Sequence, residues 1–485
     1  MTSFYKKNKE KIILVFSFLF FIYFLIWSLI KPYNFGPDEY HRYPAYFYVF
    51  IHNSLPSGWA EEIRNPIWGF SYAFMFTWLP TLVSVFFMKM TSIFSTDVNI
   101  LFHSARIPSC IMGALCVYLI FKILDFALKN EKAKWVTWAF IVSIPQFAFL
   151  SSYINNDIFA LCGALAVVYS WFYIINKKLD VKICLIFSFG MSVIILSYYN
   201  AYGWIVCSLL FVLTIMISKK EIKNKNTWLM LLLISAIVIF TTAFFCIRNI
   251  FMYDGDLFGI KTLLKSNELY AWDSIKPSVR QNPRNTGMSI LDVLFDGIYV
   301  KVLFLSFIGV FGYMQFGLRR FVYIFYFIAF SGSIILFIVS IFASVINSKK
   351  SNNTSENNVR EKFILLAFLF ISALIVFLLT LYNSWNNDYS PQGRYLYPLL
   401  PSLVAFFGLG IDYLFVNIEK IKIKNTNTLK TVLNILTASA VFVFTAVSIY
   451  CFLTVYIPAN VPVSESDPTP EESLITIKDM IIANN

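Results

Sequence analysis

The sequence predicts an all-α protein that crosses a membrane many times, and two observations carry this prediction. Of the 485 residues, 58% are hydrophobic and only 14% are charged, whereas soluble domains are about one-quarter charged. The hydrophobic residues also gather in separate runs, most of them near the length of about 20 residues that an α-helix needs to cross a bilayer. The net charge of +12 comes mainly from basic residues between the runs, which is typical of cytoplasmic loops rather than of a nucleic-acid-binding surface.

The first run, 12–30, follows Lys6, Lys7, Lys9 and Lys11. It is too long and too aromatic for the core of a signal peptide, so we expect a retained helix whose N-terminus is cytoplasmic. Further apolar runs follow at 68–88, 103–127, 134–151, 157–176, 181–198, 201–217, 228–247, 297–318, 320–346, 362–382, 396–416 and 430–457.

Charge between the runs predicts which of them cross. If every run crossed, the basic segments "KNEKAK", "NKKLDVK" and "SKKEIKNKN" would lie outside, against the preference of basic loops for the cytoplasm. The conflict disappears if 68–88, which Pro80 interrupts, lies along or dips into the outer interface. By the same logic, 297–318 is interfacial or re-entrant and 320–346 crosses, which leaves the basic segments that follow them in the cytoplasm. We therefore expect about 11 crossings, with the N-terminus inside and the C-terminus outside.

The predicted organisation is one transmembrane domain, 1–457, followed by an outer tail at 458–485. Two long loops, 31–102 and 248–319, lie on the outer face, whereas the cytoplasmic loops are short and basic and contain no glycine-rich phosphate motif. We therefore expect any chemistry outside, on a substrate that arrives without ATP or a nucleotide sugar. The seven cysteines all lie in apolar runs without metal-like spacing, so we interpret them as core residues.

The stretch "NFGPDEYHR" places two adjacent acids, Asp38 and Glu39, directly after the first apolar run. One interpretation is a pair of solvated acids, with Asp38 capping a following helix. The other is a general base at the membrane surface, where apolar surroundings raise a carboxyl pKa toward the range useful for accepting a proton from a hydroxyl group. Asp157, in "SSYINNDIF", has two similar interpretations: a helix cap, or an acid that faces Asp38 and orients an acceptor.

Three arginines stand at the expected outer ends of helices: Arg106, Arg248 and Arg394. Singly, each is equally well explained by a long side chain that reaches the membrane interface. Together they would bind a phosphate group, because a guanidinium group contacts phosphate through two hydrogen bonds, and they would stabilise its charge as it leaves.

Six stretches of the sequence, taken in the order in which they follow one another along the chain, resemble motifs of the GT-C superfamily of integral-membrane glycosyltransferases. This superfamily includes protein O-mannosyltransferases and lipid A aminoarabinose transferases. "GPDEYHR" is similar to the Asp-Glu motif of their first outer loop, and "HSARIPS" is similar to the start of their next helix. "SSYINNDIFAL", "CIRNIFMYDGDLFG" and "SFIGVFGYM" are similar to later segments. With "QGRYLYPLLP", the chain resembles a family of largely uncharacterised bacterial membrane proteins. "PDEYH" departs from the usual Pro-Asp-Glu-Pro-x-His.

The resemblance implies a GT-C-like fold and transfer of a sugar from a polyprenyl-phosphate donor, with inversion at the anomeric carbon. No metal is obviously required, because arginine supplies positive charge, and a role for a divalent cation is left open. Whether Asp38 or Glu39 takes the proton is also open. The implied roles are base for Asp38, positioning of hydroxyl groups for Glu39 and Asp157, phosphate binding for Arg248, Arg394 and Arg106, and substrate contact for Tyr40, His41, Gln392 and Tyr395.

Loops rich in lysine, asparagine and isoleucine favour a bacterial cytoplasmic (inner) membrane, with the site on its extracytoplasmic face. We expect a polysaccharide or lipid-linked glycan as acceptor, of the O-antigen kind. The alternatives are a transporter or flippase of lipid-linked sugars, an O-antigen ligase or polymerase, and a membrane scaffold without enzymatic activity. The expected crossing helices carry almost no charge away from their ends, unlike those of ion-coupled transporters.

Overall fold

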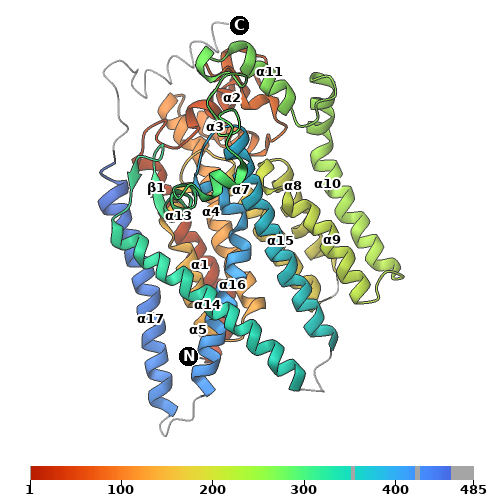
Figure 1. The fold of residues 1–485 in the computed structure, drawn as a ribbon, viewed down its shortest axis with the longest axis vertical. Helices are drawn as coiled ribbons and strands as arrows, with labels where there is room; N and C mark the ends of the chain where they lie inside the picture. The colour runs from red at the N-terminus through yellow and green to blue at the C-terminus, as the bar shows by residue number, and fades with distance from the viewer. Residues whose placement is uncertain (1, 178, 351–355, 421–425, 460–485) are drawn as a thin grey trace.

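Long helices that run between two ends of the molecule make up most of the structure (Figure 1). The computed structural model describes residues 2–177, 179–350, 356–420 and 426–459. Within these residues, nine helices are long and apolar enough to cross a membrane, and the strands are limited to one short hairpin. The chain is therefore a multi-pass membrane protein with the all-α architecture that its sequence predicts.

Short connections join the helices at the end of the bundle where α1 starts, and longer connections join them at the opposite end. In chain order they are α1 (Thr2–Ile30), α2 (Glu39–His52), η1 (Glu61–Ile63), η2 (Tyr72–Phe74), α3 (Leu79–Ser92), α4 (Val98–Ala127), α5 (Glu131–Val142), α6 (Pro145–Leu150), α7 (Asp157–Asn176), α8 (Val181–Ile195), η3 (Tyr199–Ala201), α9 (Gly203–Ser218), α10 (Lys225–Met252), α11 (Ile260–Tyr270), η4 (Asp273–Ile275), α12 (Ile290–Phe295), α13 (Tyr299–Gly309), β1 (Val310–Phe311), β2 (Phe316–Gly317), α14 (Arg320–Lys350), α15 (Glu356–Asn386), η5 (Gly393–Leu399), α16 (Leu400–Lys420), α17 (Thr426–Cys451) and the π-helical turn η6 (Phe452–Tyr456).

Two predicted interfacial runs form only short helices. Helix α3 has 14 residues and α13 has 11, so at about 1.5 Å per residue neither spans the roughly 30 Å of a hydrocarbon core. In the run 134–151 the helix is broken between α5 and α6, because Pro145 disfavours helical geometry at Ile144 and then starts α6. The nine long helices would reach the expected eleven crossings only with this broken run and with α8, which at 15 residues is also shorter than a full crossing, so the number eleven stays a prediction.

The two ends of the described chain lie on opposite faces of the bundle. Lys31, directly after α1, donates hydrogen bonds to the carbonyl groups of Ile457, at 3.1 Å, and of Ala459. The end of η6 therefore lies beside the end of α1 and far from its start, as an odd number of crossings requires. The predicted outer tail, from residue 460 onward, lies outside the described residues.

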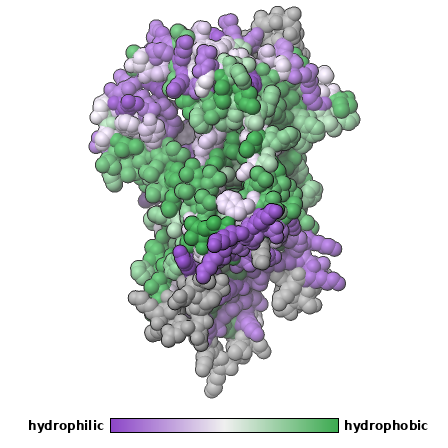
Figure 2. Space-filling model, turned by 90° about the vertical axis from the view of Figure 1, so that its right-hand side faces the viewer, coloured by the Kyte–Doolittle hydropathy of each residue, from purple (hydrophilic) through white to green (hydrophobic). Residues whose placement is uncertain are grey.

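Helix α7 forms the centre of the bundle, where it packs against α4 and α8 and is buried along nearly its whole length. Helices α10 and α17 lie at opposite edges (Figure 1) and expose large apolar side chains such as Phe240 and Phe442. Figure 2 shows a hydrophobic middle between hydrophilic ends on one side of the molecule. Helices α2, α3 and α11 gather at the end opposite the start of α1 (Figure 1), and this end holds the predicted site.

Candidate active site

Asp38 stands directly before α2, with left-handed backbone geometry (φ 65°). Its carbonyl oxygen accepts hydrogen bonds from the backbone N–H groups of His41, at 3.1 Å, and Arg42, at 3.0 Å, which begins the helix. The carboxylate itself makes no capping hydrogen bond, so the interpretation of Asp38 as a side-chain cap is not what the structure shows. Instead, its Oδ2 lies 2.9 Å from Nη2 of Arg394.

Arg394 reaches Asp38 from the opposite end of the sequence. Its side chain is only 4% exposed, whereas that of Asp38 is 24% exposed, so the carboxylate forms the accessible side of the pair. Nη2 of Arg394 also donates to the hydroxyl group of Tyr395 at 3.1 Å, and Nη1 lies 3.5 Å from the hydroxyl group of Tyr153. Nε is buried without a partner among the described residues, so its N–H group is unused.

Close backbone approaches fix both partners of this pair. A Cβ atom at Gly36 would meet the ring of Tyr153 at 2.4 Å, and one at Gly393 would meet the backbone nitrogen of Phe307 at 2.1 Å. Only glycine lets the segment before Asp38 and the start of η5 pack this closely. The sequences "GPDE" and "QGRY" therefore combine a charged residue with the glycine that places it.

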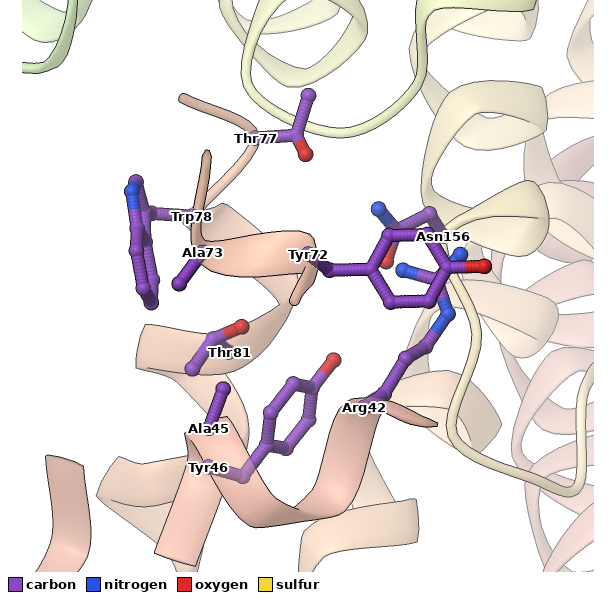
Figure 3. Close-up of a pocket in the computed structure, with 9 residues that line it drawn as sticks. All are labelled: Arg42, Ala45, Tyr46, Tyr72, Ala73, Thr77, Trp78, Thr81 and Asn156. Carbon is purple, nitrogen blue, oxygen red and sulfur yellow. The ribbon is translucent and has the colours of Figure 1, made fainter. Parts of the chain in front are cut away.

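A small cavity lies beside Arg42, between α2, η2, the start of α3 and the start of α7. Its volume of about 20 Å³ is room for about one water molecule. Figure 3 shows the guanidinium group of Arg42 directed toward Tyr72 and Asn156, with the hydroxyl groups of Tyr46 and Thr81 pointing into the same space. The guanidinium carbon lies 4.2 Å from the ring centre of Tyr72, and Nε has no partner among the described residues.

Asp157 is the first residue of α7 and is almost completely buried. The hydrogen bond that caps this helix comes from Asn155, whose Oδ1 accepts from the N–H group of Ile158 at 2.9 Å. Asp157 is therefore not needed as a cap, and its Oδ1 is buried without a partner in the described part of the chain. Burial lowers the pKa of Arg42, but Tyr72, Asp38 and Asp157 raise it, with a net rise, so both acids act on the same arginine.

Glu39 is fully buried and points away from Asp38. Its Oε1 accepts from Nε of Arg106 at 2.8 Å and from the N–H group of Ile154 at 3.1 Å. Its Oε2 accepts from Nη2 of Arg106 at 2.6 Å and from the N–H group of Gly36 at 3.1 Å. These four hydrogen bonds occupy both oxygens, and they tie the loop before α2 to α4 and to the segment before α7.

Arg106 completes this buried pair. Besides Glu39, it donates to the carbonyl groups of Ser28 at 2.8 Å, Lys31 at 2.6 Å and Pro32 at 2.9 Å. All five N–H donors of a guanidinium group are thereby used. In this arrangement the predicted phosphate contact of Arg106 lacks a free donor, and the predicted substrate contact of Glu39 lacks a free oxygen.

Arg248 lies at the side of the cavity away from Arg42. Its Nη2 donates to the carbonyl group of Pro56 at 2.5 Å, and its guanidinium carbon lies 5.5 Å from the ring centre of Trp78. Trp78 lines the cavity opposite Arg42 (Figure 3). Within the described residues, no ion pair or hydrogen bond joins Arg248 to Asp38 or Arg394, so its phosphate role stays a prediction.

Of the four predicted substrate contacts, Tyr395 is the one whose side chain is hydrogen-bonded to the Asp38–Arg394 pair within the described residues. Tyr395 contacts Arg394 directly, as described above. The Nδ1 atom of His41 is hydrogen-bonded to Nδ2 of Asn65, and the ring of Tyr40 lies 5.9 Å from that of His41. Gln392 donates from Nε2 to Oγ of Ser390 at 2.9 Å.

Charge around Asp38 keeps its carboxylate ionised. Burial raises the pKa of Asp38, but Arg394 and Arg42 lower it, and the net result lies below the ordinary value of 3.8. Burial lowers the pKa of His41; Asp38 opposes this effect and the two arginines add to it, so the net pKa lies below 6.5. At neutral pH the site therefore holds an anionic Asp38, a neutral His41 and two arginine cations.

The comparisons with solved structures concern the fold. The oligosaccharyltransferase of Archaeoglobus fulgidus in its apo form is similar to 97% of this chain, with 14% identity and a TM-score of 0.56. The same enzyme tethered to an acceptor peptide is similar to 92% of the chain, with 14% identity and a TM-score of 0.55. This chain covers only 59% and 55% of those chains. The likeness confirms the expected GT-C-like fold.

A further solved structure, the curated proteins and the protein families were also compared with this chain. ArnT from Cupriavidus metallidurans bound to undecaprenyl phosphate is similar to 98% of this chain, which covers 76% of ArnT, with 10% identity and a TM-score of 0.47. No curated protein sequence matches the chain. A family model described as "Predicted membrane protein (DUF2142)" matches residues 67–403, a stretch that includes Asp157, Arg248 and Arg394 and begins after Asp38. The chain belongs to this DUF2142 family of membrane proteins.

Proposed function

We propose that the protein transfers a single sugar from a polyprenyl-phosphate donor to a hydroxyl group of a glycan acceptor. The observation that carries this proposal is the ion pair between the accessible carboxylate of Asp38 and the buried guanidinium group of Arg394, 2.9 Å apart, with Arg42 beside it. A base and two phosphate-binding cations within one site are what a sugar transfer from a lipid phosphate requires. The GT-C-like fold supports the same class of reaction.

In the proposed reaction, Asp38 accepts the proton of the acceptor hydroxyl group as the oxygen attacks the anomeric carbon of the donor. The bond between that carbon and the phosphate oxygen breaks, and its electron pair leaves with the phosphate, so the anomeric carbon is inverted. One negative charge disappears from Asp38 while one appears on the leaving phosphate. Arg394 is hydrogen-bonded to Asp38, and its unused Nε donor can stabilise the negative charge that develops on the leaving phosphate.

The buried polar atoms around the pair suggest how the remaining substrate groups are held. Oδ1 of Asp157 and Nε of Arg42 have no partners among the described residues, although buried polar groups are normally hydrogen-bonded. We assign a sugar hydroxyl group to Asp157 and a phosphate oxygen to Arg42. Glu39 and Arg106 act as positioning residues, because their mutual hydrogen bonds hold the loop that carries Asp38.

The proposed location is a bacterial inner membrane, with the site on its extracytoplasmic face and an O-antigen-like glycan as acceptor. The site lies at the end of α1 and the start of α4, α7 and η5. The lysine-rich connections after α4, α7 and α9 lie at the opposite end, where basic residues are expected to face the cytoplasm.

A transfer assay in vesicles tests this proposal against its alternatives. Purified protein would receive a polyprenyl-phosphate hexose labelled in the sugar, with extracted cell-surface glycan as acceptor. We expect label in the glycan, one sugar per transfer, with an inverted linkage by NMR. Transfer of a whole glycan would indicate a ligase or polymerase instead. Movement of the donor across the vesicle membrane without any transfer would indicate a flippase.

Replacing Arg394 by lysine is expected to lower kcat/KM for the donor about 10-fold, because lysine keeps the charge but loses the two-pronged contact to phosphate. Arg319, which is exposed on the same face, offers a matched control as Arg319→Lys, with an expected change below about twofold. Steady-state kinetics at varied donor concentration measures both. Equal kinetics for Arg394→Lys and wild type would remove Arg394 from phosphate binding.

Titration of Asp38 is expected to leave the rate of sugar transfer unchanged between about pH 8 and about pH 5. Only the ionised carboxylate accepts a proton, and Asp38 stays ionised in this range because its pKa lies below the ordinary 3.8. Activity then falls as the pH approaches the lowered pKa. The contribution of the ion pair to stability is likewise present above the unfolded-state pKa and lost as pH falls through the folded-state value. An acidic limb near pH 6 that neither His41→Gln nor Asp157→Asn removes would contradict this assignment.

Removing divalent cations is expected to leave the transfer rate within about twofold of its starting value, because Arg394 and Arg42 supply positive charge where the phosphate leaves. The measurement is the initial rate before and after dialysis against excess chelator. A loss that Mg²⁺ or Mn²⁺ restores would show that a cation shares this role.

A further inference from the structure

A larger cavity lies at the other end of the bundle, far from Asp38. It has a volume of about 310 Å³ and opens between the last turns of α4 and α7 and the first turn of α8. The start of α1 is close by, since Glu10 pairs with Lys122 of α4 at 2.9 Å. The polar side chains that line the cavity are Lys122, Asp125, Tyr169, Tyr173, Lys177 and Lys182.

The cavity carries more positive charge than its own acids neutralise. Asp125, the acid in its lining, is already paired with Lys134 at 2.7 Å and with Lys9. Lys177 and Lys182 have no carboxylate ion-pair partner in the described ranges. The ammonium group of Lys177 lies 5.0 Å from the ring centre of Tyr173, a contact that leaves its N–H donors free.

Neighbouring acids reduce this excess but do not pair with Lys177, since Asp180 and Glu10 both act on Lys182 through charge. Asp180 is hydrogen-bonded to the hydroxyl group of Tyr173, and its Oδ1 caps α8 through the N–H group of Ile183 at 2.9 Å. Glu10 is shared between Lys122 and the hydroxyl group of Tyr118. The cavity thus offers the ammonium groups of Lys177 and Lys182 to an anion.

The surface next to the cavity indicates that this anion belongs to a lipid. Val181, Leu185 and Phe189 follow one another at helical spacing along α8 and are 54%, 52% and 41% exposed. This apolar stripe starts one residue before Lys182, so a headgroup in the cavity would have its acyl chains along α8. Lysines at the edge of a membrane attract anionic headgroups. We propose that this cavity binds the phosphate group of an anionic lipid in the leaflet on the side of the N-terminus.

Native mass spectrometry of the delipidated full chain tests the proposal with phosphatidylglycerol, phosphatidylcholine and inorganic phosphate as separate probes. The test variant is Lys177→Gln with Lys182→Gln. The matched control is Lys223→Gln with Lys225→Gln, two exposed lysines in the connection from α9 to α10 on the same face. We expect the test variant to bind phosphatidylglycerol about 10-fold more weakly than wild type, and the control to stay within about twofold.

Three other outcomes would contradict the proposal, each for a different reason. Equal affinity of wild type for phosphatidylglycerol and phosphatidylcholine would show that the phosphate charge is not recognised. Inorganic phosphate bound as tightly as the lipid would make this a site for a soluble anion. Unchanged lipid affinity in the test variant would place the lipid elsewhere. If the glutamine variant is unstable, Lys177→Arg with Lys182→Arg keeps the charge and must retain the affinity.

Discussion

Replacing Asp38 by asparagine is expected to lower the rate of sugar transfer about 10²-fold or more, the effect of removing a positioned general base. Asparagine is nearly the same size and tolerates the left-handed backbone geometry of this position, so the loop before α2 is expected to keep its shape. The amide oxygen still accepts a hydrogen bond from Arg394. The change therefore keeps this hydrogen bond but removes both the proton acceptor and the negative charge that balances Arg394.

Binding of the product, polyprenyl phosphate, separates a chemical effect from a structural one. Without the negative charge of Asp38, Arg394 is expected to bind the phosphate as tightly as in wild type or more tightly. The control is Asp273→Asn, an acid of the outer loop whose side chain is 97% exposed, which is expected to transfer at the wild-type rate. Wild-type transfer by Asp38→Asn, or loss of phosphate binding together with transfer, would rule out Asp38 as the base.

Replacing Glu39 by glutamine is expected to destabilise the protein by about 3–5 kcal/mol, the usual cost of breaking a buried ion pair on one side. Glutamine cannot neutralise Arg106, whose side chain is 1% exposed and whose other contacts are neutral carbonyl groups. The free energy of unfolding in detergent, from a denaturant titration, measures the loss. Glu61→Gln is the matched control, because Glu61 is an exposed acid of the same outer loop.

A double-variant cycle distinguishes this structural role from a catalytic one. Glu39→Gln with Arg106→Gln is expected to be less destabilised than the sum of the two single variants, because the second change removes the uncompensated charge. A Glu39→Gln protein that is as stable as wild type but inactive would contradict the positioning role and make Glu39 a candidate for the base.

The sequence predicts the long membrane-spanning helices well, because apolar composition and run length determine them. Long apolar runs became the long helices, since hydrocarbon length fixes what a crossing helix needs. The run 68–88 was harder to interpret. Its Pro80 suggested an interruption, whereas the structure places Pro80 in the first turn of α3, where proline is well tolerated. Apolar composition does not show where α5 ends, so it does not predict that the helix breaks at Pro145.

At the site, residue types were predictable and pairings were not. Asp38 and Glu39 are adjacent, but Asp38 stands before α2 with left-handed backbone geometry whereas Glu39 is the first residue of the helix, and one carboxylate meets Arg394 while the other meets Arg106. Nothing in the sequence distinguishes Arg106 from Arg394, although one is saturated by carbonyl groups and the other faces Asp38. Arg42 was missed. Its spacing of four residues from Asp38, which places both on one helix face, is the signal that could have identified it.

In the proposed reaction, the bond that breaks lies between the sugar and the phosphate, and the protein holds the phosphate. A donor labelled with ¹⁴C in the sugar and ³²P in the phosphate tests this directly. We expect ¹⁴C in the acceptor glycan and an equal amount of ³²P in free polyprenyl phosphate. Movement of ³²P into the glycan together with ¹⁴C would show transfer of a phosphosugar and would contradict the roles proposed for Asp38, Arg42 and Arg394.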